Sequence, residues 1–315
     1  MRLMVTGAGG FIGRPLVRHL SGLRWNVIRG ARTQGSQDHA ANSPVQTIGI
    51  DQGTGHFDIS GRIDCLIHLA GIAHVHGVDA EDYRSANAIW TQKLAKRAAT
   101  LGIPRFIFVS TAKVAGDSHT GPIDESAPLD PGDFYARSKA AAEAMLEKIG
   151  RESDLRIITI RPPLVYGPEV KANFLSLLRI VDAGWPLPLA AIKNQRSLIY
   201  VGNLVSAIEA CVTCSAPANR TFFVSDDHDV STPQLVEGIA VALGKSATLL
   251  PFPPRLLQCI GRLAGRGEQV ARLTESLQVN ISRIKTETGW RPPFSLQQGL
   301  AQTASWYRGQ TRKST

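Results

Sequence analysis

The chain lacks any uninterrupted apolar run that approaches the roughly 18 residues of a membrane-spanning helix. Its first residues also lack the continuous apolar stretch of a signal peptide, because glycines interrupt them. No internal repeat or low-complexity tract stands out in the 315 residues. We therefore expect a cytoplasmic protein without a membrane span.

Cysteine is scarce, and the four cysteines are too scattered for a disulfide framework in a chain of this length. Cys211 and Cys214 form a Cys-x-x-Cys pair, but they lie in an apolar helical pattern without a second pair of ligands. We expect reduced thiols and no metal site. The composition, with 43% hydrophobic and 19% charged residues, predicts a compact core in one large unit or two domains.

Acidic residues are absent from the start of the chain, since none precedes Asp38. The same segment is rich in arginine, at positions Arg2, Arg14, Arg18, Arg24, Arg29 and Arg32. A net charge of +9 raises the hypothesis of a nucleic-acid partner. The excess is spread along the chain without interleaved aromatics, so we expect no nucleic-acid partner. An anionic cofactor and a phosphorylated substrate account for the sign equally well.

A glycine-rich turn follows the first apolar segment. Residues 2–5 read as a strand that runs into Gly7, Gly10 and Gly13. Glycines at this spacing let the backbone turn sharply, approach a diphosphate and pack a new helix on the sheet. The unpaired amides and positive dipole end of that helix form an anion site. A second strand at residues 25–28 completes a β-α-β unit, which predicts a dinucleotide ligand.

The end of the second strand bears on the choice of cofactor. NAD-preferring folds of this kind place a carboxylate there, which binds the ribose hydroxyls and repels a 2′-phosphate. Here the position is about Ala31, followed by Arg32, with Arg29 close by. Arginine can pair with a phosphate in forked geometry, so NADP(H) is favoured and NAD(H) is the alternative. Asp51, at the end of a third strand over 45–50, is placed to contact the adenine.

A buried parallel strand over residues 64–71 ends in small residues, which let the backbone pass beneath the cofactor. We expect His68, a single histidine inside this apolar strand, to be structural. His74 and His76 lie on the following loop, where such sheets meet their ligands, so either could touch substrate.

Polar residues also follow in the next helix and strand. A helix predicted over 81–101 carries Asn87. A strand over 105–109 then runs into Ser110 and Thr111, whose hydroxyls are expected to enter the ligand crevice.

Tyr135 and Lys139 are four residues apart on a predicted helix and therefore share one face. A phenol with a pKa of about 10 needs a nearby cation before it exchanges protons efficiently near neutrality, and lysine provides that cation. The pair is common by itself. Downstream of a dinucleotide turn, it indicates proton exchange with a bound substrate.

Several motifs therefore occur together. They are Gly7-x-x-Gly10-x-x-Gly13, Asp64-x-x-x-His68-Leu69-Ala70-Gly71, Asn87, Ser110-Thr111, Tyr135-x-x-x-Lys139 and Arg161-Pro162-Pro163-Leu164-Val165-Tyr166-Gly167-Pro168. The combination resembles an extended short-chain dehydrogenase/reductase over nearly the whole chain. Within that superfamily the chain is similar to the nucleotide-sugar epimerase/dehydratase group, particularly to enzymes that reduce or epimerise carbon four of UDP-linked N-acetylated hexoses.

The resemblance implies a role for each matching residue. Tyr135 would be the acid or base, Lys139 would bind the nicotinamide ribose, and Thr111 would hydrogen-bond the substrate oxygen. The implied cofactor contacts are Gly7, Gly10, Phe11, Ile12, Gly13, Arg32, Asp51, Leu69, Ala70, Gly71, Asn87, Tyr135, Lys139 and Pro162. The implied substrate contacts are Thr111, Lys113, Asn173, Arg196 and Arg272.

The resemblance also implies the architecture, an α/β Rossmann fold whose doubly wound parallel sheet carries a smaller C-terminal substrate lobe. The expected boundaries are residues 1–165 for the NAD(P)-binding domain, with a return of the chain at about 196–225, and residues 166–195 and 226–315 for the lobe. Relatives dimerise through helices that match 81–101 and the alanine-rich segment at 140–144, so we expect a homodimer.

The function remains open between several enzymes. Dehydratases of the group carry Asp-Glu directly after the catalytic hydroxyl, where this chain has Ala112-Lys113. The first hypothesis is an NADP(H)-dependent reductase of a UDP-linked 4-keto-6-deoxy N-acetylhexosamine, and the alternative is a UDP-hexose 4-epimerase that retains NAD. A hydroxysteroid-type ketone reductase is disfavoured by Asn173 and Arg196. A non-catalytic NADP sensor is disfavoured because the tyrosine and lysine are both present.

Overall fold

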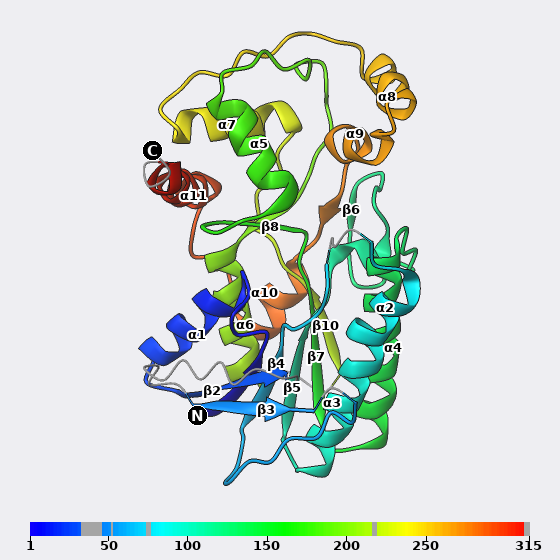
Figure 1. The fold of residues 1–315 in the computed structure, drawn as a ribbon, viewed down its shortest axis with the longest axis vertical. Coiled ribbons are helices and arrows are strands. Elements are labelled where there is room, and N and C mark those ends of the chain that lie inside the picture. Colours follow the sequence, from blue (N-terminus) through cyan, green and yellow to red (C-terminus); the bar gives the residue numbers. More distant parts are fainter. Residues whose placement is uncertain (33–45, 52, 74–76, 216–218, 312–315) are drawn as a thin grey trace.

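The centre of the molecule is a seven-stranded parallel sheet in the order β10-β7-β5-β4-β1-β2-β3 (Figure 1). The structure is a computed structural model that describes residues 1–32, 46–51, 53–73, 77–215 and 219–311. The strands are β1 (Arg2–Thr6), β2 (Asn26–Arg32), β3 (Thr47–Ile50), β4 (Cys65–His68), β5 (Arg105–Val109), β7 (Arg156–Arg161) and β10 (Arg220–Phe223). The order reverses between β1 and β4, where doubly wound sheets bind ligands. The predicted Rossmann-type α/β fold is confirmed.

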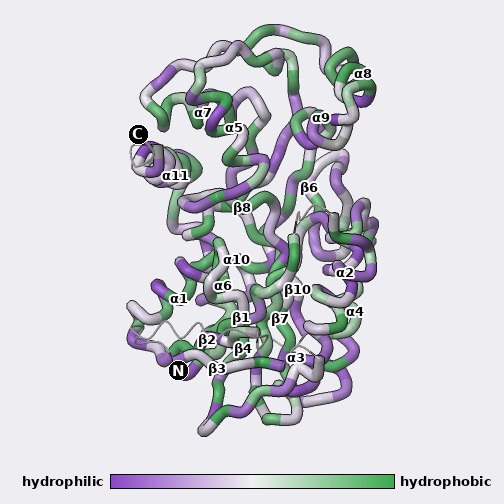
Figure 2. The backbone as a smooth tube through the Cα atoms, in the orientation of Figure 1, coloured by the Kyte–Doolittle hydropathy of each residue, from purple (hydrophilic) through white to green (hydrophobic). Residues whose placement is uncertain are grey.

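Helices cover both faces of this sheet. They are α1 (Gly13–Gly22), α6 (Val201–Thr213) and α10 (Ser282–Thr288) on one face, and α3 (Trp90–Thr100) and α4 (Phe134–Glu152) on the other. Leu3 and Val5 of β1 are buried in the first core, whereas Met4 is buried in the second. This alternation follows from the two-residue period of a strand. Figure 2 shows hydrophobic residues in the central strands, as expected when both faces are covered.

The helix predicted over 81–101 is interrupted by a wider turn. Helix α2 (Ala80–Arg84) is followed by a π-helical turn, Ser85–Ile89, before α3 begins. Asp79 starts the run with a capping box, in which its side chain accepts hydrogen bonds from the Glu81 and Asp82 amides. Asn87 lies inside the π-helical turn. Such turns occur frequently at functional sites, because they redirect a side chain without ending the helix.

A second group of elements forms a lobe above the carboxyl ends of the strands (Figure 1). Its core packs α5 (Ala172–Asp182), α7 (Thr232–Ala242) and α11 (Leu296–Thr311) with the paired strands β8 (Leu164–Tyr166) and β9 (Leu198–Tyr200). The remaining elements are the 3₁₀ turn Ala112–Ala115, β6 (Pro122–Ile123), α8 (Pro254–Leu263), α9 (Gly267–Thr274) and β11 (Gln278–Val279). Ile284 and Trp290 are buried with the sheet instead, so the chain returns to it again before α11. The predicted domain boundaries stay a proposal.

Two groups singled out in the sequence belong to the packing. The imidazole of His68 bonds the Thr6 hydroxyl at 2.6 Å and the Thr91 hydroxyl at 2.8 Å, and burial holds its pKa well below the usual value. His68 is therefore a neutral core residue that joins β1 to α3. Burial likewise raises the pKa of Cys211 on α6, which keeps that thiol protonated. None of the helices in the described ranges combines the length and apolar character needed to cross a membrane.

Candidate active site

The glycine turn after β1 packs directly against the end of β4. Gly7 has a φ of +71°, and a Cβ added there would lie 2.7 Å from the Ala70 nitrogen. A Cβ on Gly13 would lie 2.1 Å from the Gly7 carbonyl oxygen. Both contacts are closer than a side chain permits. Gly7 is therefore required for its positive φ and for this close contact, and Gly13 for the close contact alone. Together they place the start of α1 over the switch point of the sheet.

The start of α1 fits the diphosphate of a dinucleotide. Ile12, at the N-cap, provides no side-chain hydrogen bond to the helix amides. The first turn of α1, all of which the structure describes, contains no acidic residue. The amide groups and the positive end of the helix dipole therefore stay available to an anion. Space above Gly9 is open, since a Cβ there would meet nothing within 4 Å. The glycine turn and the start of α1 thus fit the dinucleotide diphosphate that the sequence predicts.

Asn87 connects the π-helical turn to the loop after β4 and to α4. Its side-chain oxygen accepts from the Ile72 amide at 2.8 Å, and its nitrogen donates to the Ile72 carbonyl and to the Ser138 hydroxyl, each at 2.9 Å. Ser138 donates in turn to the Tyr135 carbonyl at 2.7 Å. Asn87 was predicted as a cofactor contact. The structure places it as the group that joins the glycine-ended strand to the tyrosine helix.

Ser138 lies in the candidate site, and the sequence patterns do not point to it. It lies between Tyr135 and Lys139 in the sequence Tyr-x-x-Ser-Lys, directly before the lysine. A serine inside a helix normally bonds a carbonyl of the preceding turn and carries no signal of its own. Its contact with Asn87 depends on the π-helical turn, which no sequence pattern indicates.

Lys139 is buried beside the last residues of β5. Only 4% of the residue is exposed, and its ammonium donates to the Val109 carbonyl at 2.7 Å and lies 4.2 Å from the centre of the Phe108 ring. Burial lowers the pKa of Lys139 to about 7, although the Glu143 carboxylate acts in the opposite direction. The lysine therefore loses its proton more readily than a lysine exposed to solvent.

Thr111 begins the 3₁₀ turn that follows β5. Its hydroxyl accepts from the Lys113 amide at 3.3 Å, and the next amide, of Ala112, donates to the Pro162 carbonyl at 2.8 Å. The contact between these two strand ends brings the predicted residues Thr111 and Pro162 together. Ser110, beside them, is buried, and its hydroxyl has no hydrogen-bond partner in the described part of the chain.

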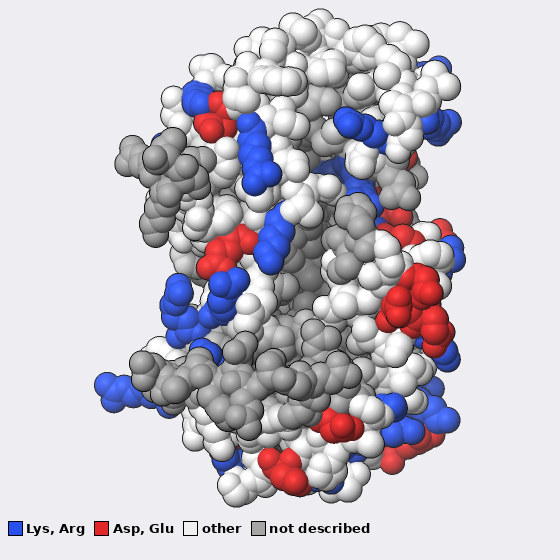
Figure 3. Space-filling model, viewed as in Figure 1, with Lys and Arg blue, Asp and Glu red and all other residues white. Residues whose placement is uncertain are grey.

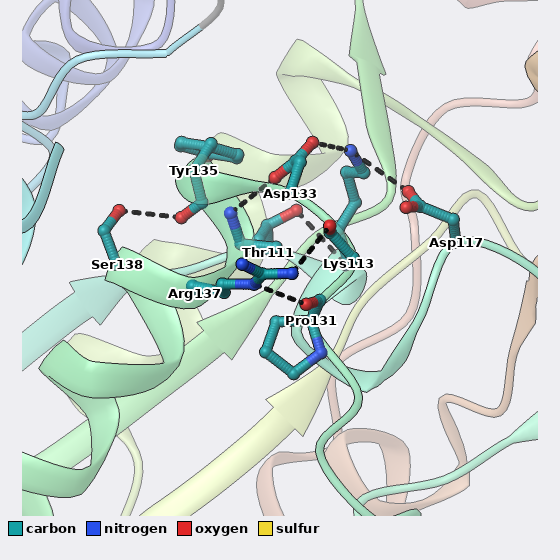
Figure 4. A network of polar contacts seen from close by, with 10 residues as sticks. Thr111, Lys113, Asp117, Pro131, Asp133, Tyr135, Arg137 and Ser138 are labelled. Atoms are coloured by element: carbon teal, nitrogen blue, oxygen red, sulfur yellow. Dashed lines mark hydrogen bonds and ion pairs between the residues drawn. The ribbon is translucent and has the colours of Figure 1, made fainter. Parts of the chain in front are cut away.

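Lys113 joins the Thr111 turn to the start of α4 (Figure 4). Its ammonium pairs with the carboxylates of Asp133 and, at 3.0 Å, of Asp117. Asp133 also caps α4 by accepting from the Ala136 amide at 2.7 Å. Asp133 was not singled out in the sequence, although an aspartate directly before a helical pattern is a known N-cap signal. The predicted substrate contact Lys113 thus fixes the helix that carries Tyr135.

Tyr135 lies two residues into α4, in a setting that favours the protonated phenol. Burial raises the pKa of Tyr135, and the Asp133 carboxylate and Tyr83 raise it further. The ring of Tyr83 packs edge-on against that of Tyr135, with ring centres 6.4 Å apart. A general base needs a lowered phenol pKa, so this shift is opposite to the one required. Ionisation of the phenol therefore requires additional positive charge beside it.

Arginines of the lobe lie across from this turn. Arg196 donates to the Glu275 carbonyl at 2.9 Å, and the charges of Asp117 and Arg272 both act on its pKa, which burial lowers. Because Asp117 also pairs with Lys113, the structure brings three of the predicted substrate contacts into one neighbourhood. Asn173 lies separately, exposed on the first turn of α5. Figure 3 shows a hollow between the two halves of the molecule, with Lys and Arg on its rim.

The predicted phosphate and adenine contacts, Arg32 and Asp51, lie at the ends of β2 and β3. Arg32 ends β2, but its side chain lies outside the described part, as do His74 and His76. Asp51 accepts two hydrogen bonds from Thr54, at 2.7 and 2.6 Å, and these lower the pKa of its carboxyl group. Its contact with adenine stays a prediction.

The packing of the turn yields a test with an internal control. Gly13→Ala should lower the free energy of unfolding by about 1–3 kcal/mol, the usual cost of overpacking, and should weaken NAD binding because the turn must shift. Gly9→Ala, whose new methyl group enters open space, should change stability by less than about 0.5 kcal/mol. Denaturant titration and calorimetric NAD titration measure both effects. Equal stability of the two variants would contradict the packing argument.

The burial of Lys139 predicts a pH dependence of stability. Its pKa is about 7 in the folded protein against 10.5 in the unfolded chain, so the unfolded chain binds more protons between these values and stability rises with pH there. Without nucleotide, the free energy of unfolding of the wild type should rise relative to Lys139→Met by about 1 kcal/mol per unit between roughly pH 7.5 and 9. Parallel profiles for the two proteins would show that the lysine is not buried in this way.

Comparisons with known proteins agree with this arrangement. The model of the "NAD dependent epimerase/dehydratase family" matches residues 3–224. A UDP-glucose 4-epimerase of Vibrio cholerae is 38% identical over 313 residues, which cover 96% of this chain and 94% of the relative.

Solved structures share the fold over the full length. MoeE5, in complex with UDP-glucuronic acid and NAD, aligns with a TM-score of 0.76 and 22% identity, covering 100% of both chains. The UDP-glucuronic acid 4-epimerase of Bacillus cereus, in complex with NAD, aligns with a TM-score of 0.77 and 21% identity, covering 98% of this chain and 99% of that one. These matches give no support to the predicted preference for NADP(H). On the family match and the full-length identity, the chain belongs to the NAD dependent epimerase/dehydratase family.

Proposed function

We propose that the protein is an NAD-dependent 4-epimerase of a UDP-linked hexose. The observation that carries the proposal is the 38% identity to a UDP-glucose 4-epimerase across nearly the whole of both chains. It is supported by the presence of Thr111, Tyr135 and Lys139 around the carboxyl end of β5. This choice replaces the reductase, favoured from the sequence alone, as the first hypothesis.

The residues divide the work of such a reaction. A bound nicotinamide supplies the acceptor, and later the donor, of the hydride. Tyr135 removes the proton of the C4 hydroxyl group and returns it after the 4-keto sugar has turned its other face. Thr111 holds the same oxygen by a hydrogen bond. Lys139, released from the Val109 carbonyl, holds a ribose hydroxyl and brings the positive charge that Tyr135 requires.

The arginines of the lobe bind the diphosphate of the substrate. Arg196 and Arg272 provide charge-assisted donors on one side of the hollow, and Asn173 provides an amide on α5. We also keep the homodimer as a proposal. The exposed positions of α4 combine Arg137, Glu147 and Lys148 with Ala144 and with Phe134, which is 50% exposed.

Elimination of water is disfavoured by the residues after Thr111. A 4,6-dehydratase needs an acid and a base close to the sugar, and here Ala112 is buried while Lys113 is held in ion pairs. The carboxylates of Asp133 and Asp117 beside this turn both pair with that lysine. This site therefore offers proton exchange at one oxygen and no separate acid-base pair for dehydration.

A second candidate is the 4-ketoreductase that uses NADPH. The observation in its favour is strand β2, which ends at Ala31 and Arg32 and carries no carboxylate where NAD-preferring relatives bind the ribose hydroxyls. A reductase would release its oxidised cofactor and consume a 4-keto-6-deoxy sugar in equal amounts.

The two candidates predict different products. With NAD present in catalytic amounts, UDP-glucose and UDP-N-acetylglucosamine should be converted to their C4 epimers without net consumption of cofactor, as followed by NMR. Tyr135→Phe should lower kcat by roughly 10²–10⁴-fold, because the proton acceptor is lost. Tyr307→Phe removes a buried phenol of α11 and serves as the matched control with unchanged kcat. Stoichiometric NADPH oxidation on a 4-keto sugar, with no epimer formed from either UDP-sugar, would replace the epimerase by the reductase.

A further inference from the structure

Helix α8 presents an apolar face to solvent at the far end of the lobe. Leu256 and Ile260 are each 53% exposed and Leu263 is 90% exposed. Their spacing of four and then three residues places them on one side of the helix. Isolated exposed apolar residues are ordinary, but three on one helix face form a continuous surface.

The opposite side of α8 is firmly packed. A Cβ on Gly261 would lie 2.5 Å from the Val270 side chain of α9, and Gln258 donates to the Thr274 hydroxyl at 3.0 Å. Leu257 packs against the core of the lobe. The outward position of Leu256, Ile260 and Leu263 therefore follows from a docked helix, since rotation would expose these contacts instead.

Positive charge lies along one edge of this face. Arg255, Arg262 and Arg266 are exposed, and the first two are seven residues apart, so they line the same edge of the helix. No aspartate or glutamate occurs in residues 238–267. Figure 2 shows hydrophobic and hydrophilic segments alternating on α8, and Figure 3 shows basic side chains at the same end of the molecule. An apolar face with arginines along its edge is typical of helices that lie in a membrane interface.

Two further apolar side chains are exposed on the loops of the lobe. Leu250, just before α8, is 47% exposed, and its amide donates to the Leu187 carbonyl at 2.8 Å. Trp185, two residues earlier than Leu187, is 69% exposed. Tryptophan is favoured where an apolar phase meets water, because its ring is apolar and its N–H is polar.

From this surface we propose that α8 docks the protein on an anionic lipid bilayer. The apolar side chains would enter the boundary between headgroups and acyl chains, while the arginines bind lipid phosphates. A second copy of the chain is a poorer occupant. A two-fold interface would bring the arginine edges of both helices together, and α8 itself carries no carboxylate to pair with them.

Vesicle flotation with the full-length protein tests the proposal. The wild type should float with phosphatidylglycerol-containing phosphatidylcholine vesicles and remain at the bottom with phosphatidylcholine alone. Leu256→Ser combined with Ile260→Ser and Leu263→Ser should lower the partition coefficient at least about 10-fold. Arg255→Gln combined with Arg262→Gln and Arg266→Gln should lower it by about 100-fold, since each arginine near an anionic surface contributes roughly fivefold.

Matched controls remove the same groups elsewhere. Leu23→Ser combined with Leu101→Ser and Leu129→Ser removes three exposed leucines from the other half of the molecule, and Arg18→Gln combined with Lys96→Gln and Lys148→Gln removes the same number of exposed charges. Both controls should bind vesicles like the wild type. The proposal is overturned if the wild type fails to float with anionic vesicles, or if the α8 variants float as the controls do. A wild-type dimer that the leucine-to-serine variant converts to monomer, without vesicle binding, would assign the surface to a second copy.

Discussion

The attachment of α4 to the end of β5 is the constraint on which the rest of the site depends. Lys139 reaches into the sheet to bond the Val109 carbonyl, and one turn further along, Glu143 forms a buried ion pair with Arg161 of β7 at 2.5 Å. At the start of the helix, Asn87 holds Ser138 and Asp133 holds Lys113. Breaking one partner of a buried pair is costly, so the helix has little freedom to slide on the sheet.

This attachment explains the electrostatics of the two groups that would exchange protons. The contacts that fix Lys139 also bury it, and burial lowers its pKa to about 7. The contacts that fix Tyr135 set it beside Asp133, whose carboxylate raises the pKa of the phenol. The positions of Tyr135 and Lys139 are therefore fixed without a ligand, whereas their protonation states are not yet those that proton exchange needs. A site of this kind gains its working charge state when positive charge and hydroxyl partners are brought in with the ligands.

Much of the fold and part of the site could be predicted because they rest on local rules. The turn after β1 could be predicted because only glycine fits at positions Gly7 and Gly13. The shared face of Tyr135 and Lys139 could be predicted because their spacing of four residues matches the helical period. The sequence could not indicate the π-helical turn that carries Asn87, since its energy comes from contacts with the Ile72 backbone and with α4. Lys113 is predicted to touch substrate, whereas its ammonium pairs with Asp117, four residues further on, and with Asp133. The second pair depends on where the intervening loop places the start of α4. The exposure of the apolar face of α8 could not be predicted either, because apolar residues at helical spacing predict a buried face.

The central claim is that the phenol, the hydroxyl and the ammonium meet one sugar beside a dinucleotide held by the glycine turn. Determination of the structure with NAD and UDP-glucose bound tests it most directly. The account predicts the Tyr135 and Thr111 hydroxyls within about 3.2 Å of the C4 oxygen, the Lys139 ammonium on a ribose hydroxyl, and the diphosphate of NAD over the amides that begin α1. A sugar whose C4 lies out of reach of Tyr135, or a dinucleotide held away from the turn, would contradict it.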